Sequence, residues 1–260
     1  MAMWVWKDRV LFPDHLSAFA EKHGIATLFV YVSPTAAAVL LDGNKDAVAA
    51  VRAMRANGRE VYAVAGEPDW AWGPIKMPEH SALLVRLATE TGLFDGIHFD
   101  VEPNALPEWN EEAGRRNLLK GTLKFYDLLR AAAPDQTIDI AVNPIFATLA
   151  TDGSNFMHEL AKRARSLSIM AYRAEPKRAL EWAAPAVAQI EAVGRRWRMG
   201  AEVGRAEPGT SWRGTPSDRF STAMVEFDTL IASRFTSHHY AGLALHDYDA
   251  LAEMYGEADG

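Results

Sequence analysis

The chain has 260 residues, of which 49% are hydrophobic and 23% charged, as is typical of a soluble globular protein. It contains no cysteine, so disulfide bonds and thiolate metal sites are excluded. The formal net charge of −7 argues against nucleic acids and anionic membranes as partners, because both attract basic surfaces.

Short apolar segments alternate with longer, alanine-rich segments along the whole chain. The apolar segments have the length of strands, and none is long enough to span a bilayer. They predict strands at Trp4–Trp6, Thr27–Val32, Glu60–Ala65, Gly96–Val101, Thr137–Val142, Ser168–Tyr172, Arg198–Ala201 and Gly242–Leu245.

The segments between these strands carry the start and stop signals of helices. Two of them end at Gly58 and Gly92, since glycine is favoured just after a helix. A third stops before Pro134, which cannot continue a helix. The predicted helices are Pro13–His23, Lys45–Asn57, Pro78–Thr91, Glu108–Ala133, Phe156–Ala164, Lys177–Val193 with Pro185 inside it, Thr222–Arg234 and Asp249–Met254.

This alternation predicts an α/β fold, the (β/α)8 barrel, which commonly uses about 250 residues as one domain. An open doubly wound sheet alternates in the same way, but it usually has a glycine-rich turn after its first strand when it binds nucleotides. Here Trp6 is followed by Lys7, Asp8 and Arg9. No linker or low-complexity segment interrupts the pattern. We therefore expect a single barrel domain over residues 1–260, with its active site at the C-terminal edge of the strands.

The fourth predicted strand carries three polar side chains on one face. Side chains alternate between the two faces of a strand, so the odd-numbered residues 97 to 101 should pack under the helices. His98, Asp100 and Glu102 then face the barrel interior. Burying an imidazole and two carboxyls is costly unless they are paired or solvated, so this row indicates a functional site.

Other predicted strands also end in a polar residue on the inward-facing row. These residues are Asn143 on strand five, Tyr172 on strand six, Glu202 on strand seven and His246 on strand eight. Barrel enzymes carry their catalytic groups at this C-terminal edge. We expect the four residues to surround one site together with Glu102.

The run from Asp95 to Glu102, DGIHFDVE, resembles the fourth-strand signature of family 18 glycoside hydrolases, the chitinase group, which is D-G-x-D-x-D-x-E. The segment Met170–Tyr172 is similar to the M-x-Y on the sixth strand of that group. The resemblance implies that Glu102 is the general acid, that Asp100 positions an acetamido group of the substrate and that Tyr172 supports the same group.

The chain departs from that family at three positions. His98 and Arg173 stand where the family usually has aspartates, and His246 stands where it places a tryptophan under the sugar. These departures suggest a divergent relative of the chitinases.

A weaker resemblance links the chain to the large retaining superfamily that includes cellulases. Glu102-Pro103-Asn104 and Glu202-Val203-Gly204 are similar to its strand-four and strand-seven motifs, although Val101 replaces the usual asparagine. That resemblance implies that Glu102 is the acid and Glu202 the nucleophile.

Glycoside cleavage needs a protonated carboxyl near the leaving oxygen and an anion near the developing oxocarbenium ion. An ionised Asp100 is expected to raise the pKa of Glu102 and keep it usable as an acid. His98, one step deeper, is expected to hydrogen-bond Asp100. If Asp100 is not the nucleophile, either the substrate's own acetamido group or Glu202 must serve.

Sugar sites also need flat apolar surfaces on which pyranose faces can pack. Trp70 and Trp72, paired in the loop after strand three, are the first candidates, whereas Trp182 is expected to pack between helices. The complete set of candidate sugar-binding residues is Trp6, Tyr31, Trp70, Trp72, His98, Asn143, Arg173 and His246.

Two other classes of function stay open. A metal-dependent hydrolase or isomerase would use His98, Asp100, Glu102, Glu202 and His246 as nitrogen and oxygen ligands, although their spacing matches no known metal motif. A barrel that binds sugars without cleaving them is expected to lack the acid, and Glu102 is present. We expect a carbohydrate substrate, no cofactor and no metal, and the sequence carries no signal of an oligomeric state.

No signal peptide precedes the strand-like segment at Trp4. We therefore expect a cytoplasmic protein, or a periplasmic or secreted one if the natural chain has a leader before Met1.

Overall fold

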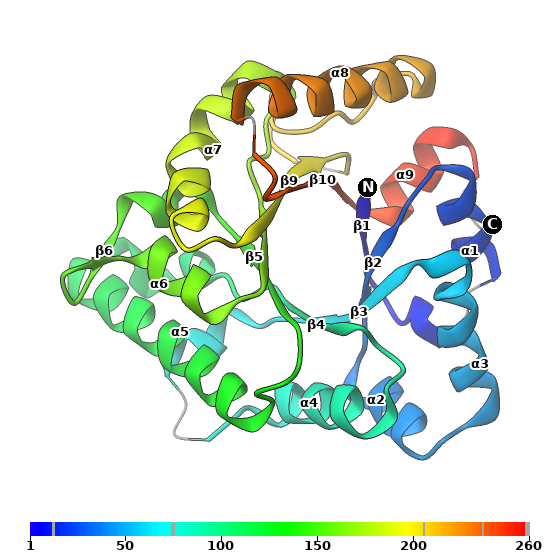
Figure 1. Cartoon of the computed structure of the whole chain (residues 1–260), viewed down its shortest axis with the longest axis horizontal. Coiled ribbons are helices and arrows are strands. Elements are labelled where there is room, and N and C mark those ends of the chain that lie inside the picture. Colours follow the sequence, from blue (N-terminus) through cyan, green and yellow to red (C-terminus); the bar gives the residue numbers. More distant parts are fainter. Residues whose placement is uncertain (12–13, 74–75, 205, 236, 258–260) are drawn as a thin grey trace.

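Eight parallel strands close into a barrel, and helices surround it (Figure 1). The computed structural model describes residues 1–11, 14–73, 76–204, 206–235 and 237–257. Around the barrel the strands follow the order β1-β10-β9-β8-β5-β4-β3-β2, which confirms the predicted (β/α)8 fold. The barrel strands are β1 Ala2–Val5, β2 Thr27–Tyr31, β3 Glu60–Ala65, β4 Gly96–Phe99, β5 Ile138–Val142, β8 Ser166–Ile169, β9 Arg196–Glu202 and β10 Tyr240–His246.

The helices lie outside the barrel and connect its strands (Figure 1). Strands β6 Ala150–Thr151 and β7 Ser154–Asn155 form a separate antiparallel hairpin. The helices are α1 Asp14–Lys22, α2 Pro34–Leu41, α3 Lys45–Met54, α4 Glu79–Thr91, α5 Glu112–Ala132, α6 Phe156–Arg163, α7 Pro176–Glu191, α8 Ser217–Phe235 and α9 Tyr248–Tyr255. Pro13, the expected start of the first helix, lies outside the described residues.

Sequence reasoning missed α2. The segment 34–41 is almost entirely apolar, so it shows no polar face from which a helical period can be recognised. The signal that could have revealed it is Ser33, whose hydroxyl accepts a hydrogen bond from the backbone N–H of Ala36 at 3.1 Å. Two helices, α2 and α3, therefore follow β2 where one was expected.

Several predicted boundaries are wrong by a few residues. Helix α3 ends at Met54, because Asn57 adopts a left-handed backbone with φ 61°. Helix α5 begins at Glu112, because residues 107–110 form a separate 3-10 helix. Strand β8 ends at Ile169, so Tyr172 lies in the loop beyond it.

The predicted alternation on the fourth strand is confirmed. Ile97, Phe99 and Val101 are at most 2% exposed and belong to the core between barrel and helices. The even-numbered residues of this strand face inward, and a second, smaller core fills the barrel. That inner core consists of Ala2, Trp4, Phe29, Tyr62, Val64, Ala141, Met170 and Ala244.

A buried polar cluster lies beside this inner core. Asp139 accepts hydrogen bonds from Nδ1 of His98 at 2.8 Å, from Arg198 at 3.0 Å and from the Ser166 hydroxyl. His98 and Asp139 are register partners on β4 and β5, which corrects the expectation that His98 bonds to Asp100. Nε2 of His98 accepts a hydrogen bond from the Trp4 indole at 3.1 Å. His98 is fully buried, so it is not available to a sugar.

Candidate active site

A pocket of about 420 Å³ opens at the C-terminal mouth of the barrel. Its lining comes from the segments after β4, β5, β8 and β9, from α7 and from the end of β10. The pocket is lined by Asp100, Glu102, Asn143, Met170, Tyr172, Arg173, Trp182, Ala206, Glu207, Thr210 and His246. Six of the residues that the sequence predicted, on four different strand ends, therefore share one pocket: Asp100, Glu102, Asn143, Tyr172, Arg173 and His246.

Asp100 is the first residue after β4, and its position depends on close contact with the neighbouring strand. Its backbone N–H donates to the carbonyl oxygen of Ala65 at 3.2 Å. A Cβ atom at Gly66 would lie 1.9 Å from the Asp100 carbonyl oxygen, so only glycine allows this approach. Oδ1 of Asp100 is buried and has no hydrogen-bond partner among the described residues.

The surroundings of Asp100 raise the pKa of its own carboxyl. Burial, and then the charge of Glu102, raise the pKa of Asp100 to about 7, and the charge of His246 partly opposes them. The sequence led us to expect a raised pKa at Glu102. The carboxyl whose pKa is raised in the structure is Asp100, and its Oδ1 is buried.

Glu102 lies two residues further out and is partly exposed to the pocket. The amide of Asn104 approaches its Oε2 at 3.5 Å, a distance at the weak limit of hydrogen bonding. The Glu102 carboxyl is therefore only lightly restrained and can bond to a molecule in the pocket.

Tyr172 offers a buried hydroxyl to the same pocket. Burial, followed by the charges of Asp100, Glu202 and Glu102, raises the pKa of Tyr172 well above its usual 10, so the hydroxyl keeps its proton. Within the described part of the chain this hydroxyl has no partner. The ring fits because residue 200 is glycine, where a Cβ atom would lie 2.9 Å from the Tyr172 ring.

Glu202 and His246 are neighbours across β9 and β10. Oε2 of Glu202 accepts a hydrogen bond from Nδ1 of His246 at 2.8 Å, and Oε1 accepts one from the Gly204 N–H at 2.6 Å. Burial lowers the pKa of His246, but the bond to Glu202 and the charges of Glu202, Asp247 and Asp100 outweigh burial, so the pKa is raised. Glu202 is 7% exposed and does not line the pocket.

Arg173 and Trp182 form another wall of the pocket. The Arg173 guanidinium stacks 3.9 Å from the centre of the Trp182 ring and donates to the carbonyl oxygen of Tyr172 at 2.7 Å. We expected Trp182 to be a packing residue, and its place on the pocket wall is a correction. Sequence reasoning also missed Glu207 and Thr210, because the loop after β9 carries no pattern that marks them.

The other aromatic candidates divide into two groups. Trp70 is 6% exposed and packs against Phe125 with ring centres 5.4 Å apart, so the expectation that it contacts sugar is wrong. Trp72 is 47% exposed but does not line the pocket. Trp6 directly follows β1 and Tyr31 ends β2, and their ring centres are 6.1 Å apart. Neither of them belongs to the pocket lining.

The predicted metal-ligand set does not assemble. His98 pairs with Asp139, and His246 pairs with Glu202. Among the residues that the structure describes, no three His, Asp or Glu side chains converge as a metal site would require. Asn143 lines the pocket, but its side chain also accepts a hydrogen bond from the Ile145 N–H at 3.1 Å and so caps the following turn.

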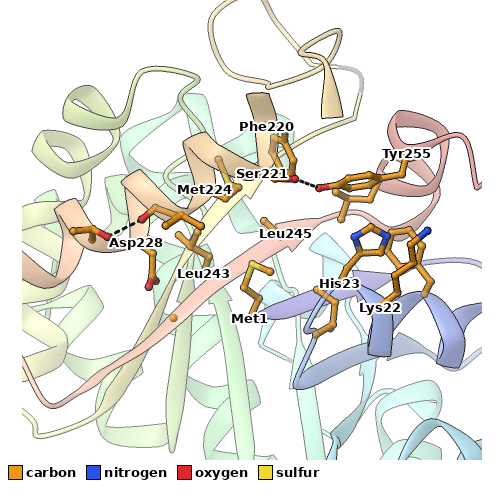
Figure 2. Close-up of a pocket in the computed structure, with 16 residues that line it drawn as sticks. Met1, Lys22, His23, Phe220, Ser221, Met224, Asp228, Leu243, Leu245 and Tyr255 are labelled. Atoms are coloured by element: carbon orange, nitrogen blue, oxygen red, sulfur yellow. Dashed lines mark hydrogen bonds between the residues drawn. The ribbon is translucent and has the colours of Figure 1, made fainter. Parts of the chain in front are cut away.

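A larger cavity of about 520 Å³ lies on the side of the barrel, between α1, α8, α9 and β10 (Figure 2). Several of its polar side chains already have partners: the Ser221 and Tyr255 hydroxyls are 2.8 Å apart, and Lys22 bonds to Glu257, outside the lining, at 3.0 Å. Asp100, Glu102 and Glu202, the acids at the strand ends, do not line it. The smaller pocket at the mouth is therefore the better candidate for chemistry.

No protein-family model matches the chain, and no curated protein matches its sequence. Solved structures match its fold. A chitinase from Chromobacterium violaceum is 14% identical with a TM-score of 0.59, and the match covers 98% of this chain and 97% of that one. A GH18 chitinase from Cycas revoluta in complex with (GlcNAc)3 is 11% identical with a TM-score of 0.56, covering 98% and 96%.

The same barrel occurs in other enzymes. A putative deoxyribose-phosphate aldolase from Toxoplasma gondii ME49 is 12% identical with a TM-score of 0.55, and the match covers 98% of this chain and 90% of that one. At these identities the likeness defines the class of fold, a (β/α)8 barrel shared by chitinases and aldolases. No helix in the described part of the chain combines the length and hydrophobicity that a bilayer span requires.

Proposed function

We propose that the protein cleaves a glycosidic bond, with Glu102 as the general acid. The observation that carries the proposal is the convergence of Asp100, Glu102 and Tyr172 on one pocket at the barrel mouth. Barrel enzymes hold their catalytic groups at this edge, and a pair of carboxyls is the usual equipment of a glycosidase. The shared fold with chitinases agrees with this proposal.

The unpaired polar atoms of the pocket support a bound substrate. Buried polar atoms are normally hydrogen-bonded, so each exception calls for a reason. Oδ1 of Asp100 and the hydroxyl of Tyr172 are two such exceptions among the described residues, and both belong to the pocket lining. A sugar with an amide substituent offers an N–H donor for the first and a carbonyl acceptor for the second.

In the proposed reaction, protonated Glu102 gives its proton to the leaving glycosidic oxygen while the bond to the anomeric carbon breaks. The carbonyl oxygen of the substrate's acetamido group attacks that carbon from the other side. Asp100 accepts a hydrogen bond from the acetamido N–H, and Tyr172 donates one to the acetamido oxygen. Water then opens the cyclic intermediate and returns a proton to Glu102.

The surroundings of Glu202 favour this substrate-assisted route over a protein nucleophile. Both carboxylate oxygens of Glu202 already accept short hydrogen bonds, and the residue does not line the pocket. An attack by Glu202 would first have to break its bond to His246.

An aldolase-type reaction has less support from the pocket. Schiff-base chemistry requires a lysine amine, and no lysine is among the described residues that line the pocket at the mouth. The three acids Asp100, Glu102 and Glu207 fit hydrolysis better.

The test is hydrolysis of a panel of N-acetylated and non-acetylated oligosaccharides by the wild type and by Glu102→Gln. We expect turnover of an N-acetylated substrate with retention at the anomeric carbon, and a loss of at least about 100-fold in Glu102→Gln. Glu108→Gln is the matched control, since Glu108 is an exposed acid six positions further along the chain. Its activity should equal that of the wild type.

Three outcomes would contradict the proposal. One is full activity of Glu102→Gln. Another is a large fall in its thermal midpoint, which would mark Glu102 as a structural residue. The third is a stoichiometric divalent metal ion in purified protein whose removal abolishes turnover.

A further inference from the structure

The imidazole of His246 is held from both sides. Its Nδ1 lies 2.8 Å from Oε2 of Glu202, and its Nε2 lies 2.8 Å from the indole nitrogen of Trp6. An indole N–H can only donate, so Nε2 must present its lone pair to Trp6. Nδ1 therefore carries the proton and donates it to Glu202. The two contacts specify one neutral tautomer.

The same arrangement occurs one layer deeper in the barrel. Trp4 donates to Nε2 of His98 at 3.1 Å, and Nδ1 of His98 bonds to Asp139 at 2.8 Å. Trp4 lies on β1 and Trp6 is the first residue after it, two positions further along the extended chain, so both indoles point to the same side. In both layers the order is indole, imidazole, carboxylate.

The two layers differ in their access to solvent. The side chain of His98 is 0% exposed, whereas that of His246 is 27% exposed and borders the pocket. The deeper layer is sealed inside the barrel, and only the upper layer can meet a substrate.

Both nitrogens of His246 are occupied, so the ring has no free donor or acceptor to offer. What remains available to the pocket is its carbon edge and ring faces. The ring lies beside Tyr172, with centres 5.9 Å apart and planes tilted by 35°.

We infer that Trp6 and Glu202 are positioning residues that hold His246 in one tautomer and one orientation, so that His246 contacts the sugar as a neutral surface and exchanges no proton with it. That the contacted molecule is a sugar rests on the proposed function. The sequence suggested sugar binding for Trp6 and nucleophilic attack for Glu202, and the positioning role replaces both.

Protonation of His246 is the event that would undo this arrangement. A proton on Nε2 would face the indole N–H of Trp6, and two donors cannot bond to each other. The charged groups that face the ring are Glu202, Asp247 and Asp100, with Tyr172 beside them. The tautomer is therefore measured at pH 8, because an alkaline pH favours the neutral ring.

The first experiment records long-range ¹H–¹⁵N spectra of the histidine side chains at pH 8, with His246→Gln used to assign the signal. We expect the Nδ1–H tautomer at His246 in the wild type. Trp6→Phe keeps an aromatic ring but removes the donor, so Nε2 becomes free to take a proton while Nδ1 stays bonded to Glu202. The doubly protonated imidazolium should therefore be more populated at His246 in this variant than in the wild type. His98 should not change in the same sample, because its donor is Trp4.

Trp197→Phe is the matched control. It also removes an indole donor bonded to a glutamate, the 2.9 Å contact with Glu191, but this pair lies outside the barrel interior. Its His246 spectrum should equal that of the wild type. An Nε2–H tautomer in the wild type, or an unchanged His246 spectrum in Trp6→Phe, would overturn the inference.

The second experiment measures turnover of the substrate found in the oligosaccharide panel. Trp6→Phe should raise KM about fivefold, the effect of one lost hydrogen bond, and leave kcat nearly unchanged. Glu202→Gln can keep an acceptor for Nδ1 only by turning its amide N–H2 toward the Gly204 N–H, so its KM should rise while kcat stays within about tenfold of the wild type. A fall in kcat of Glu202→Gln as large as that of Glu102→Gln would show that Glu202 is the nucleophile and would reject the positioning role. If no glycan is cleaved at all, the proposed function fails, while the spectra still decide the tautomer.

Discussion

Asp139 and His98 are register partners on adjacent strands, and they form a 2.8 Å hydrogen bond with no exposure to solvent. Arg198 completes the pair at 3.0 Å from the other oxygen of Asp139. Burial raises the pKa of Asp139, but the bonds to His98, Arg198 and Ser166 outweigh burial and lower it. The carboxylate therefore stays charged inside the barrel and neutralises Arg198.

Removal of this carboxylate should be strongly destabilising. In Asp139→Ala the buried Arg198 loses its buried partner and keeps only the longer contact with Glu60 at 3.9 Å, so the free energy of unfolding should fall by about 3–5 kcal/mol. Urea-induced unfolding measures the loss. Because the folded pKa of Asp139 is lowered, its contribution is present above the unfolded pKa near 4 and is lost as the pH falls below it.

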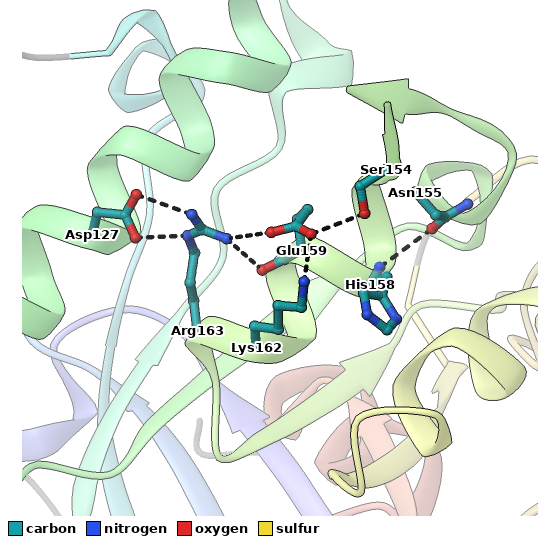
Figure 3. Close-up of polar contacts among 7 residues, drawn as sticks. All are labelled: Asp127, Ser154, Asn155, His158, Glu159, Lys162 and Arg163. Atoms are coloured by element: carbon teal, nitrogen blue, oxygen red, sulfur yellow. Dashed lines mark hydrogen bonds and ion pairs between the residues drawn. The ribbon is translucent and has the colours of Figure 1, made fainter. Parts of the chain in front are cut away.

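Asp127→Ala is the control, because it breaks an exposed pair of the same chemistry. Asp127 bonds to Arg163 at 2.7 Å on the outer surface, and Arg163 also holds Glu159 at 3.1 Å (Figure 3). The loss there should be below about 1 kcal/mol. Equal losses in the two variants would mean that burial of the Asp139 cluster has no energetic weight.

Asp100→Asn should stabilise the protein, and the gain should grow with pH. The folded pKa of Asp100, about 7, lies above the unfolded value near 4, so the wild type loses stability as the pH rises through this window. Asparagine does not titrate. Relative to the wild type, the variant should gain roughly 2 kcal/mol more at pH 8 than at pH 5. Urea unfolding at the two pH values checks this, with Glu108→Gln as a control that shows no pH-dependent gain.

Tyr172→Phe and Tyr126→Phe form a matched pair. Both hydroxyls are buried and, within the described residues, lack a hydrogen-bond partner, but only Tyr172 lines the pocket. Neither change should lower the thermal midpoint, since no hydrogen bond is lost. Only Tyr172→Phe should reduce kcat/KM, by about 10–100-fold. A similar loss of activity in Tyr126→Phe would show that the effect is not local to the pocket.

The two tryptophans after β3 should behave in opposite ways. Trp70 is 6% exposed, so Trp70→Ala should lower the free energy of unfolding by about 3–5 kcal/mol. Trp72 is 47% exposed, and Trp72→Ala should change it by no more than about 0.5 kcal/mol. Chemical denaturation of both variants distinguishes them. A large loss in Trp72→Ala would contradict the exposed position of its ring.

Local patterns in the sequence predicted much of this structure. The period-two alternation at residues 97 to 102 was enough to place Asp100 and Glu102 on the inner face, because that face is set by the strand itself. Partners could not be found in this way. The pairing of His98 with Asp139 and of His246 with Glu202 depends on the register between strands, which single-strand patterns do not contain.

The aromatic residues show the same limit. Trp70 and Trp72 are separated by one residue in the same short loop, yet one is buried and the other exposed. The difference arises where the 3-10 helix of residues 68–72 meets α5, at a contact so close that Gly121 has no room for a Cβ atom. Trp182 was misjudged for a related reason, since only the packed structure brings it against Arg173.

The close approach of Gly66 to Asp100 has a consequence for how the protein tolerates change. Residue 66 has no side chain and meets no substrate, yet any larger residue there would push the end of β4 outward and carry both acids with it. A screen of random variants for lost turnover should therefore return position 66 alongside the acids themselves. The short distance between the backbones at Gly66 and Asp100 therefore restricts which substitutions position 66 tolerates, as catalysis restricts those at Asp100 and Glu102.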